Sequence, residues 1–427
     1  MRAATESPEG ATGPWTAILQ TSGARSYWLV GGFITTMISA HYLGPSGRGI
    51  YAAAVGWVAL FSTFGHLSLS QVVVFRATGK DKDEWLPDTF GTMLALVGVL
   101  ALIGWCVAGA VYLFTRGEAF GHIPLSVLVL AFASLPILLW LESGNSTLIS
   151  LGELNVLNGA QVVGTTAGIF FTFLLVGVLR YDIEGGLVAV FATQLLISSV
   201  GIARIRRHAR QVRFNPTVAR ELLAGGSKLH MNAVGTFLFA QANVLLLNYY
   251  RTPAETGFFQ IAVQLLTALQ VIPLAVSTVA YSIVARKGPD EAWPEQRSLL
   301  LKSLAIMVCV GAVAYVSAPA ALVTVGGAAF LPSVPVFRIL LLTLIGATCS
   351  MVMASQWIGR GLFKTAAFLS LGVGIASFAA NMLVIPSHGM VGAAWVSVAV
   401  YSVSIIGNGI MAVIIERRVR RLRINEA

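Results

Sequence analysis

His66 is a titratable residue deep inside an apolar segment, the charge-free run Gly49–Phe75. An ionisable side chain in such a run is a candidate functional group by default. Its imidazole, which titrates near pH ~6.5 when unperturbed, could carry a coupled proton, whereas a neutral histidine could simply hydrogen-bond a neighbouring helix. The sequence leaves both interpretations of His66 open, ion coupling and packing.

Motifs for enzyme chemistry are missing from the sequence. It contains no Gly-x-x-x-x-Gly-Lys-Ser/Thr loop for ATP, and no His-Glu-x-x-His, Gly-x-Ser-x-Gly or Gly-x-Gly-x-x-Gly. No pair of carboxylates lies inside an apolar run, and Cys106, Cys309 and Cys349 lack the spacing of a zinc site. We therefore expect no catalytic residue, no bound metal and no cofactor, although coupling to protons or sodium stays open.

The elements that hold these residues are long apolar runs. Eleven charge-free runs extend from Ser26–Gly47 to Thr365–Ile415, and the last is long enough for two spans. About 20 residues at ~1.5 Å rise cross a hydrocarbon core of ~30 Å, and barrel strands are far shorter than these runs. The sequence therefore predicts an all-α polytopic membrane protein with twelve transmembrane helices.

Lys and Arg residues are distributed unequally between the two sides of the expected membrane. With twelve spans both termini lie on one side, and that side holds all but five of the 28 cations. Because cytoplasmic loops carry the excess of cations, both termini are predicted to be cytoplasmic. The same placement explains the net charge of +10, so we expect contact with anionic membrane lipid and no binding of nucleic acid. The five outer cations are Arg48, Arg116, Arg180, Arg251 and Arg338.

The chain divides into two halves of similar pattern. A shift of 208 residues matches Pro45 with Pro253 and Gly49 with Gly257. Because each half has an even number of spans, we expect a parallel repeat about an axis along the membrane normal, with a cleft between the halves. The expected division is a cytoplasmic tail at 1–22, a first six-helix bundle at 23–205, a basic cytoplasmic linker at 206–227, a second six-helix bundle at 228–416 and a basic cytoplasmic tail at 417–427.

Glycines and a proline make a tight turn after the first span, in Leu43-Gly44-Pro45-Ser46-Gly47-Arg48-Gly49-Ile50-Tyr51-Ala52. Here the chain resembles the Wzx-type polysaccharide flippases of the MOP superfamily, whose first loop commonly reads Leu-Gly-Pro-x-Gly-x-Gly-x-Tyr-Ala. The likeness continues at 64–71, 330–340 and 385–394, and so covers nearly the whole chain. The twelve-span count is typical of this family rather than of fourteen-span lipid II flippases.

The resemblance implies a transporter and not an enzyme. It implies two six-helix bundles around a V-shaped cavity lined by helices 1, 2, 7 and 8. It also implies a cargo, a polyprenyl-pyrophosphate-linked oligosaccharide, which moves from the inner to the outer leaflet of a bacterial cytoplasmic membrane by alternating access. A glycan polymerase and a ligase of the same pathway are the expected protein partners.

The candidate binding residues follow from the cavity helices that the resemblance names. Arginine's forked guanidinium suits phosphate oxygens, and amides could hydrogen-bond sugar hydroxyls; topology and helix–helix contacts are the alternatives. The cations are Arg25 and Lys228 at the cytoplasmic starts of helices 1 and 7, Arg76 and Arg286 at the cytoplasmic ends of helices 2 and 8, and Arg48 and Arg251 at the rims of the outer turns. The amides are Gln241, Asn243, Gln260 and Gln264, and His66 is the candidate for ion coupling or sugar contact.

Two other functions stay open. A cation-coupled drug antiporter of the MATE type would favour buried carboxylates, and the apolar runs contain none. A membrane-embedded glycan polymerase or ligase would usually carry a large outer loop with catalytic Arg, His or acidic residues, whereas the outer loops here are short and poor in charge.

Overall fold

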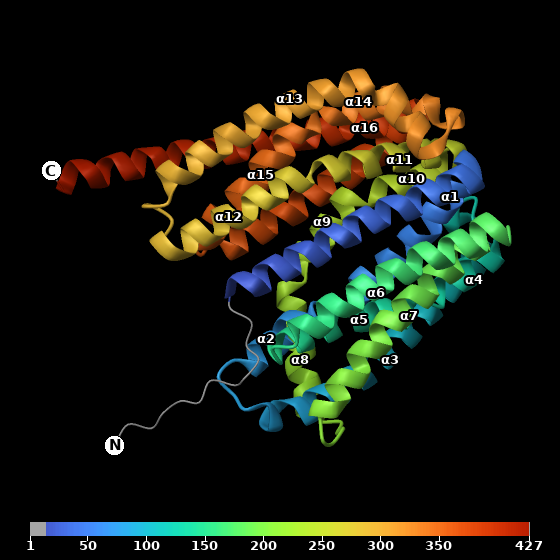
Figure 1. Ribbon diagram of the computed structural model, residues 1–427, viewed down its shortest axis with the longest axis horizontal. Coiled ribbons are helices and arrows are strands. Elements are labelled where there is room, and N and C mark those ends of the chain that lie inside the picture. The colour runs from blue at the N-terminus through green and yellow to red at the C-terminus, as the bar shows by residue number, and fades with distance from the viewer. Residues whose placement is uncertain (1–13, 427) are drawn as a thin grey trace.

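The computed structural model describes residues 14–426, with side chains described for 23–419, and every regular element in this range is helical (Figure 1). The all-α fold expected from the sequence is confirmed. The first half contains α1 (Pro14–Gly65), α2 (Leu69–Ala77), α3 (Lys82–Thr115), η1 (Glu118–Phe120), α4 (Leu125–Phe132), α5 (Leu135–Ser150), α6 (Leu154–Thr172), η2 (Phe173–Val178) and α7 (Asp182–His208). After the connecting helix α8 (Pro216–Leu229), the second half contains α9 (Met231–Ala240), α10 (Ala242–Tyr250), α11 (Pro253–Leu269), α12 (Val271–Lys287), α13 (Trp293–Gly326), η3 (Ala328–Ser333), α14 (Val334–Leu341), α15 (Thr343–Gly359) and α16 (Phe363–Glu426).

The two longest helices are each interrupted at a glycine. In α1, Gly44 has φ 64° and is followed by Pro45, and in α16, Gly389 has φ 54° and follows Pro386 by three residues. Glycine tolerates a positive φ because it has no Cβ, and proline removes a backbone donor from the helix. α1 and α16 therefore each consist of two helices joined at a kink. α1 begins at Pro14, within the segment expected as a tail.

Several described helices are long and apolar enough to cross a membrane. Length and composition give six of them among the described residues, or up to nine if each of three bent pairs is one span. α1 and α16 enter that count once each although both are kinked, and α9 is a further short apolar helix. The chain is a multi-pass membrane protein, and the number twelve stays a prediction.

The two largest apolar cores among the described residues lie one in each bundle. One core takes its residues from 53–222 and the other mainly from 244–394. In Figure 1 the first bundle lies below, the second above, and α1 runs between them. Ala53 and Ala54 of α1 are buried in the first core, whereas Ala40 and Ala52 are buried in the second. α1 is therefore shared by both bundles.

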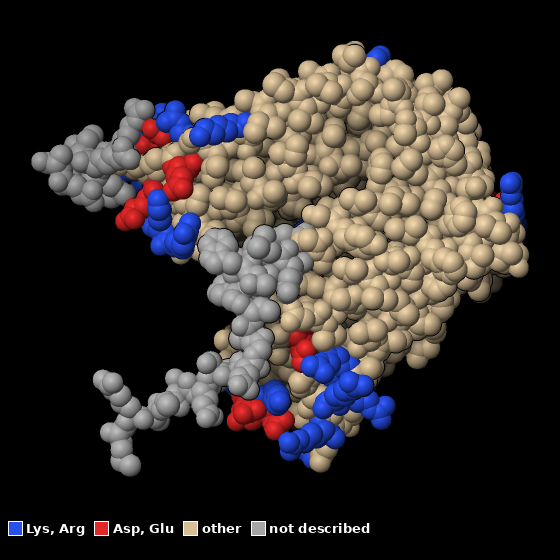
Figure 2. Space-filling model, viewed as in Figure 1, with Lys and Arg blue, Asp and Glu red and all other residues tan. Residues whose placement is uncertain are grey.

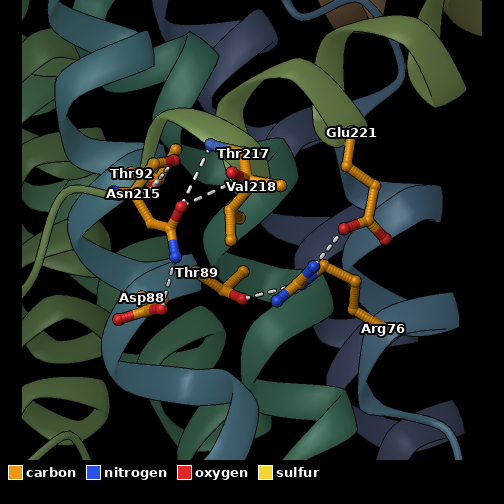
Figure 3. Close-up of polar contacts among 8 residues, drawn as sticks. All are labelled: Arg76, Asp88, Thr89, Thr92, Asn215, Thr217, Val218 and Glu221. Atoms are coloured by element: carbon orange, nitrogen blue, oxygen red, sulfur yellow. Dashed lines mark hydrogen bonds and ion pairs between the residues drawn. The ribbon is translucent and has the colours of Figure 1, made fainter.

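The connection between the bundles is a helix that packs on the first bundle (Figure 3). Asn215 caps α8, because its Oδ1 accepts hydrogen bonds from the backbone N–H groups of Thr217 at 3.0 Å and Val218 at 3.5 Å. Its Nδ2 donates to Oδ2 of Asp88 on α3 at 2.7 Å, and Val218 is buried in the first core. The segment 206–227, expected as a basic linker, contains the end of α7 and most of α8.

Charged side chains gather at one end of the molecule. In Figure 2 most of the blue and red atoms lie at the left ends of the two lobes, and the surface between the lobes is hollowed there. α1 begins and α16 ends at this same end in Figure 1. The cleft therefore opens toward the side that the distribution of cations predicts to be cytoplasmic, while the location of the termini stays a prediction.

Candidate functional site

A cavity of about 590 Å³ lies inside the first bundle. Its walls are formed by α1, α5, α6 and α7, with no lining residue from the second bundle among those described. The resemblance implies walls from helices 1, 2, 7 and 8. Helices 1 and 2 are the two arms of α1 on either side of Gly44, and both line the cavity, whereas the helices expected as 7 and 8, α9–α10 and α11–α12, contribute no described lining residue. The difference arises because one face of α1, from Trp28 through Thr35 to Ser39, turns toward α5, α6 and α7.

Arg48 is the cation of this cavity, and it is buried there rather than placed at the rim of the outer turn, as the sequence had suggested. Its side chain is 6 % exposed, and its Nη1 donates to Ser39 Oγ at 2.9 Å. Its Nε donates to Gln260 Oε1 at 3.1 Å, and the guanidinium carbon lies 4.9 Å from the ring centre of Tyr51. The residue is enclosed because the neighbouring Gly49 brings α1 into backbone contact with α11.

The charge of Arg48 is left without an anionic partner. Its described contacts are a hydroxyl, an amide and an aromatic ring, and it forms no ion pair with any residue in 23–419. A buried charge is costly unless it is paired and hydrogen-bonded. An anion that entered the cavity would supply the missing countercharge, so the site is suited to bind one.

The remaining walls carry hydroxyl and amide groups. Thr165 is 7 % exposed, and its Oγ1 is buried without a hydrogen-bond partner, as is Oε1 of Gln194. Trp28 adds an aromatic ring to the lining, and Glu142 is the one carboxylate among the described lining residues. Such walls could hydrogen-bond a ligand rich in hydroxyl groups.

His66 also lines the cavity, but it does not lie within a continuous helix as the sequence suggested. α1 ends at Gly65, and Leu67 and Ser68 have positive φ, so the helix breaks at His66. Nδ1 of His66 accepts a hydrogen bond from the Ser68 backbone N–H at 3.0 Å, and the His66 ring lies 5.3 Å from that of His230. His66 thus links the end of α1 to the start of α9, and its role in coupling stays a prediction.

The other candidate cations lie away from the cavity lining. Arg76 donates to Thr89 Oγ1 at 3.2 Å and pairs with Glu221 of α8, as Figure 3 shows. Arg251 pairs with Glu255 at 3.0 Å. Side chains already held in this way are less free to bind a ligand. Arg25, Lys228 and Arg286 are exposed and, like Arg76 and Arg251, do not line the cavity.

The four candidate amides are placed differently from one another. Gln260 contacts Arg48, as described above, and Gln241 is exposed at the junction of α9 and α10. Asn243 is buried, and its Nδ2 donates to Ser397 Oγ at 3.4 Å, which joins two helices of the second bundle. Gln264 is half-buried. No amide of this set lines the cavity, and their role in binding stays a prediction.

Sequence reasoning missed most of the cavity lining. Ser39, Thr165 and Gln194 stand in no motif that predicts a ligand site, although Thr165 belongs to a small-residue stretch, Gly164–Gly168, that indicates close helix packing. The spacing of Gly32, Thr36 and Ser39 on one face of α1 was the available signal, because polar residues on one stripe of a membrane helix face the interior.

A separate polar cluster fixes the turn between α5 and α6. Oε1 of Glu153 accepts hydrogen bonds from Arg204 Nη2 at 2.8 Å and from His208 Nε2 at 2.7 Å. Burial alone would raise the pKa of Glu153, but the hydrogen bonds from Arg204 and His208 outweigh it and lower the pKa below its usual value. Glu153 therefore stays ionised and holds part of the basic end of α7.

Solved structures with this fold are membrane transporters. An inward-facing multidrug resistance MATE family transporter of the MOP superfamily gives a TM-score of 0.71 at 14 % identity, over 94 % of this chain and 99 % of that chain. Lipid II flippase MurJ in an inward closed conformation gives a TM-score of 0.75 at 14 % identity, over 92 % of this chain and 86 % of that chain. An outward-facing multidrug resistance MATE family transporter gives a TM-score of 0.55 at 14 % identity, over 96 % of this chain and 97 % of that chain. These similarities establish the fold.

Sequence comparison gives the family. No curated protein matches the chain. The model of one family, described as "Polysaccharide biosynthesis protein", matches residues 22–286, from the first helix to the last turn of α12. Because this match covers more than half of the sequence, the chain belongs to the polysaccharide biosynthesis protein family.

Proposed function

We propose that this protein is a flippase that moves a polyprenyl-pyrophosphate-linked oligosaccharide from the inner to the outer leaflet of the cytoplasmic membrane. The observation that carries the proposal is Arg48, a buried cation that contacts the cavity and has no described anionic partner. The family description and the lipid II flippase of the same fold support it.

The chemistry of such a cargo requires a polar path through the protein. An unpaired ion costs ~20 kcal/mol to bury in the idealised Born limit, so a pyrophosphate cannot cross bare hydrocarbon. Arg48 would pair with the pyrophosphate, because a guanidinium donates two parallel hydrogen bonds to phosphate oxygens. Thr165 and Gln194 would hydrogen-bond the first sugars, and the polyprenyl tail would stay in the lipid.

Alternating access then accounts for transport without an enzymatic step. The cleft that opens at the charge-rich end would admit the cargo from the cytoplasmic leaflet, and rocking of the bundles would release it outside. This cycle uses membrane lipid and the glycolipid, with no cofactor, and a glycan polymerase and a ligase would take up the product. Coupling to a proton or sodium gradient would make net transport of the glycolipid run in one direction.

A cation-coupled drug antiporter is the second candidate, since a multidrug MATE transporter has the same fold. Two features of the cavity weigh against it. Arg48 would repel a cationic drug, and Glu142, the one carboxylate in the described lining, is exposed rather than buried. Nothing in the described residues favours a polymerase or ligase.

Binding and flipping by one pair of variants test the proposal. Arg48→Gln should weaken binding of a prenyl-diphosphate-linked disaccharide by roughly 10–100-fold, since hydrogen bonds to charged groups contribute about 1.5–3 kcal/mol. Its flipping rate in proteoliposomes should fall in parallel. Arg180→Gln is the matched control, because Arg180 is an exposed outer arginine away from the cavity. If both variants lost binding and flipping to the same extent, or if Arg48→Gln lost neither, the proposal would be rejected.

A further inference from the structure

The two bundles touch most closely where α1 crosses α11, at the end away from the charge-rich mouth. A Cβ on Gly49 would overlap the carbonyl oxygen of Pro253, and a Cβ on Gly257 would overlap that of Pro45. These are the residues that the 208-residue shift relates to each other, so the two repeats meet reciprocally. The backbones of α1 and α11 are in direct contact here, and only glycine fits at positions 49 and 257.

Direct hydrogen bonds between the bundles surround this crossing. Asn248 of α10 is fully buried, and its Nδ2 donates to the Phe120 carbonyl at 3.0 Å. Nδ1 of His122 lies 2.8 Å from the carbonyl oxygen of Asn248, and Nδ1 of His41 lies 3.1 Å from the carbonyl oxygen of Val325. These contacts, together with the crossing of α1 and α11, form what we call the outer seal.

Arg48 belongs to both the outer seal and the cavity. Its Nε donates to Gln260 of α11 across the bundle boundary, while its Nη1 and its aromatic contact stay within α1. It is the one permanently charged group among the described hydrogen bonds of the seal. A guanidinium binds an anionic oxygen more strongly than a neutral amide oxygen, because the hydrogen bond is then ionic at both ends.

A diphosphate in the cavity would therefore compete with Gln260 for the same guanidinium. We propose that Gln260 is a positioning residue that latches Arg48 across the two bundles, and that a diphosphate bound to Arg48 releases this latch and lets the outer seal open. The identity of the anion rests on the proposed function; the latch itself does not. Outward opening would then follow binding of the cargo rather than occur in the empty protein.

Two substitutions at one position separate a latch from a merely structural contact. Gln260→Ala removes the acceptor, and Gln260→Glu keeps its shape and converts the contact into an ion pair. A latch predicts opposite effects on opening, whereas a packing role predicts the same direction for both. Thr267→Val on the same helix is the control, because Thr267 is exposed and the one hydrogen bond described for its hydroxyl is to the Val263 carbonyl of its own helix.

Opening is measured as the rate at which a cysteine inside the seal reacts with a membrane-impermeant thiol reagent added from outside. The cysteine replaces Ala52, which is buried one turn beyond Arg48, in a chain whose three native cysteines are serine. Geranyl diphosphate is the probe. Wild type should label slowly and about tenfold faster with the probe. Gln260→Ala should label fast without it, Gln260→Glu should label slowly with or without it, and Thr267→Val should match wild type.

Two results would overturn this inference. One is a shift of Gln260→Ala and Gln260→Glu in the same direction. The other is Arg48-dependent binding of geranyl diphosphate that leaves labelling of wild type unchanged. Calorimetric binding to wild type and Arg48→Gln is measured alongside and tests the proposed cargo separately. Absence of diphosphate binding would reject the cargo and the release step, while opposite effects at Gln260 would still support the latch.

Discussion

Gly49→Ala is the substitution that should damage the contact between the bundles most directly. The added Cβ would lie 2.8 Å from the carbonyl carbon of Pro253 and 2.9 Å from the backbone nitrogen of Gly257, closer than real Cβ atoms approach other groups. Both neighbours are main chain, so no flexible side chain can move aside. Overpacking of this kind costs about 1–3 kcal/mol, and the helix propensity of alanine returns up to ~1 kcal/mol. We expect a net loss of about 1–2 kcal/mol.

Unfolding monitored by tryptophan fluorescence would measure the loss in purified protein. Gly98→Ala is the matched control, because a methyl group added to Gly98 in α3 would meet no neighbouring side chain or helix within 4 Å. It should be neutral or stabilising by up to ~1 kcal/mol. Gly49→Ala should also speed labelling of the cysteine at Ala52 from outside, since the bundles are forced apart. A Gly49→Ala protein as stable and as slowly labelled as wild type would refute the reasoning.

Three further predictions concern helix α8, the Glu153 cluster and topology. Asn215→Ala removes the cap of α8 and should lower stability by about 1 kcal/mol, with faster hydrogen exchange in α8; unchanged exchange would contradict the cap. Because the folded pKa of Glu153 is lowered, its stabilisation is present above the unfolded value of ~4.3 and is lost as pH falls through the folded value. The melting temperature of Glu153→Gln should lack that acid-dependent decrease. If wild type and Glu153→Gln show the same dependence of melting temperature on pH, Glu153 makes no such contribution. Cysteines at Ser46 and Ser387 should label from outside in intact cells and one at Ser298 should not, the reverse being incompatible with the predicted topology.

The helices could be predicted from the sequence because hydropathy is a local property. A run of apolar residues must satisfy its own backbone in lipid, whatever its neighbours are, so its length and composition already require a helix. The kinks at Gly44 and Gly389 follow from equally local chemistry, since glycine and proline occur together at both.

The environment of Arg48 could not be predicted in this way. Its position in the sequence places it at the rim of a turn, but its burial depends on α11, whose Gln260 is 212 residues away in the sequence. The repeat offered a partial signal, because Gly49 and Gly257 match each other, yet nothing local says that matched residues touch. The helix break at His66 could not be predicted for a related reason. The break after Gly65 involves positive φ at Leu67 and Ser68, and neither residue type is typical of that conformation.

The central claim is that the protein moves a diphosphate-linked glycan between leaflets. Its most direct test is the rate at which a fluorescent prenyl-diphosphate-linked disaccharide changes leaflet in proteoliposomes, followed by quenching from outside. Our account predicts transfer that depends on the protein, that is far faster than in empty liposomes, and that is not seen for the same disaccharide on an uncharged prenol. Equal transfer of both lipids, or no transfer beyond that of empty liposomes, would contradict it.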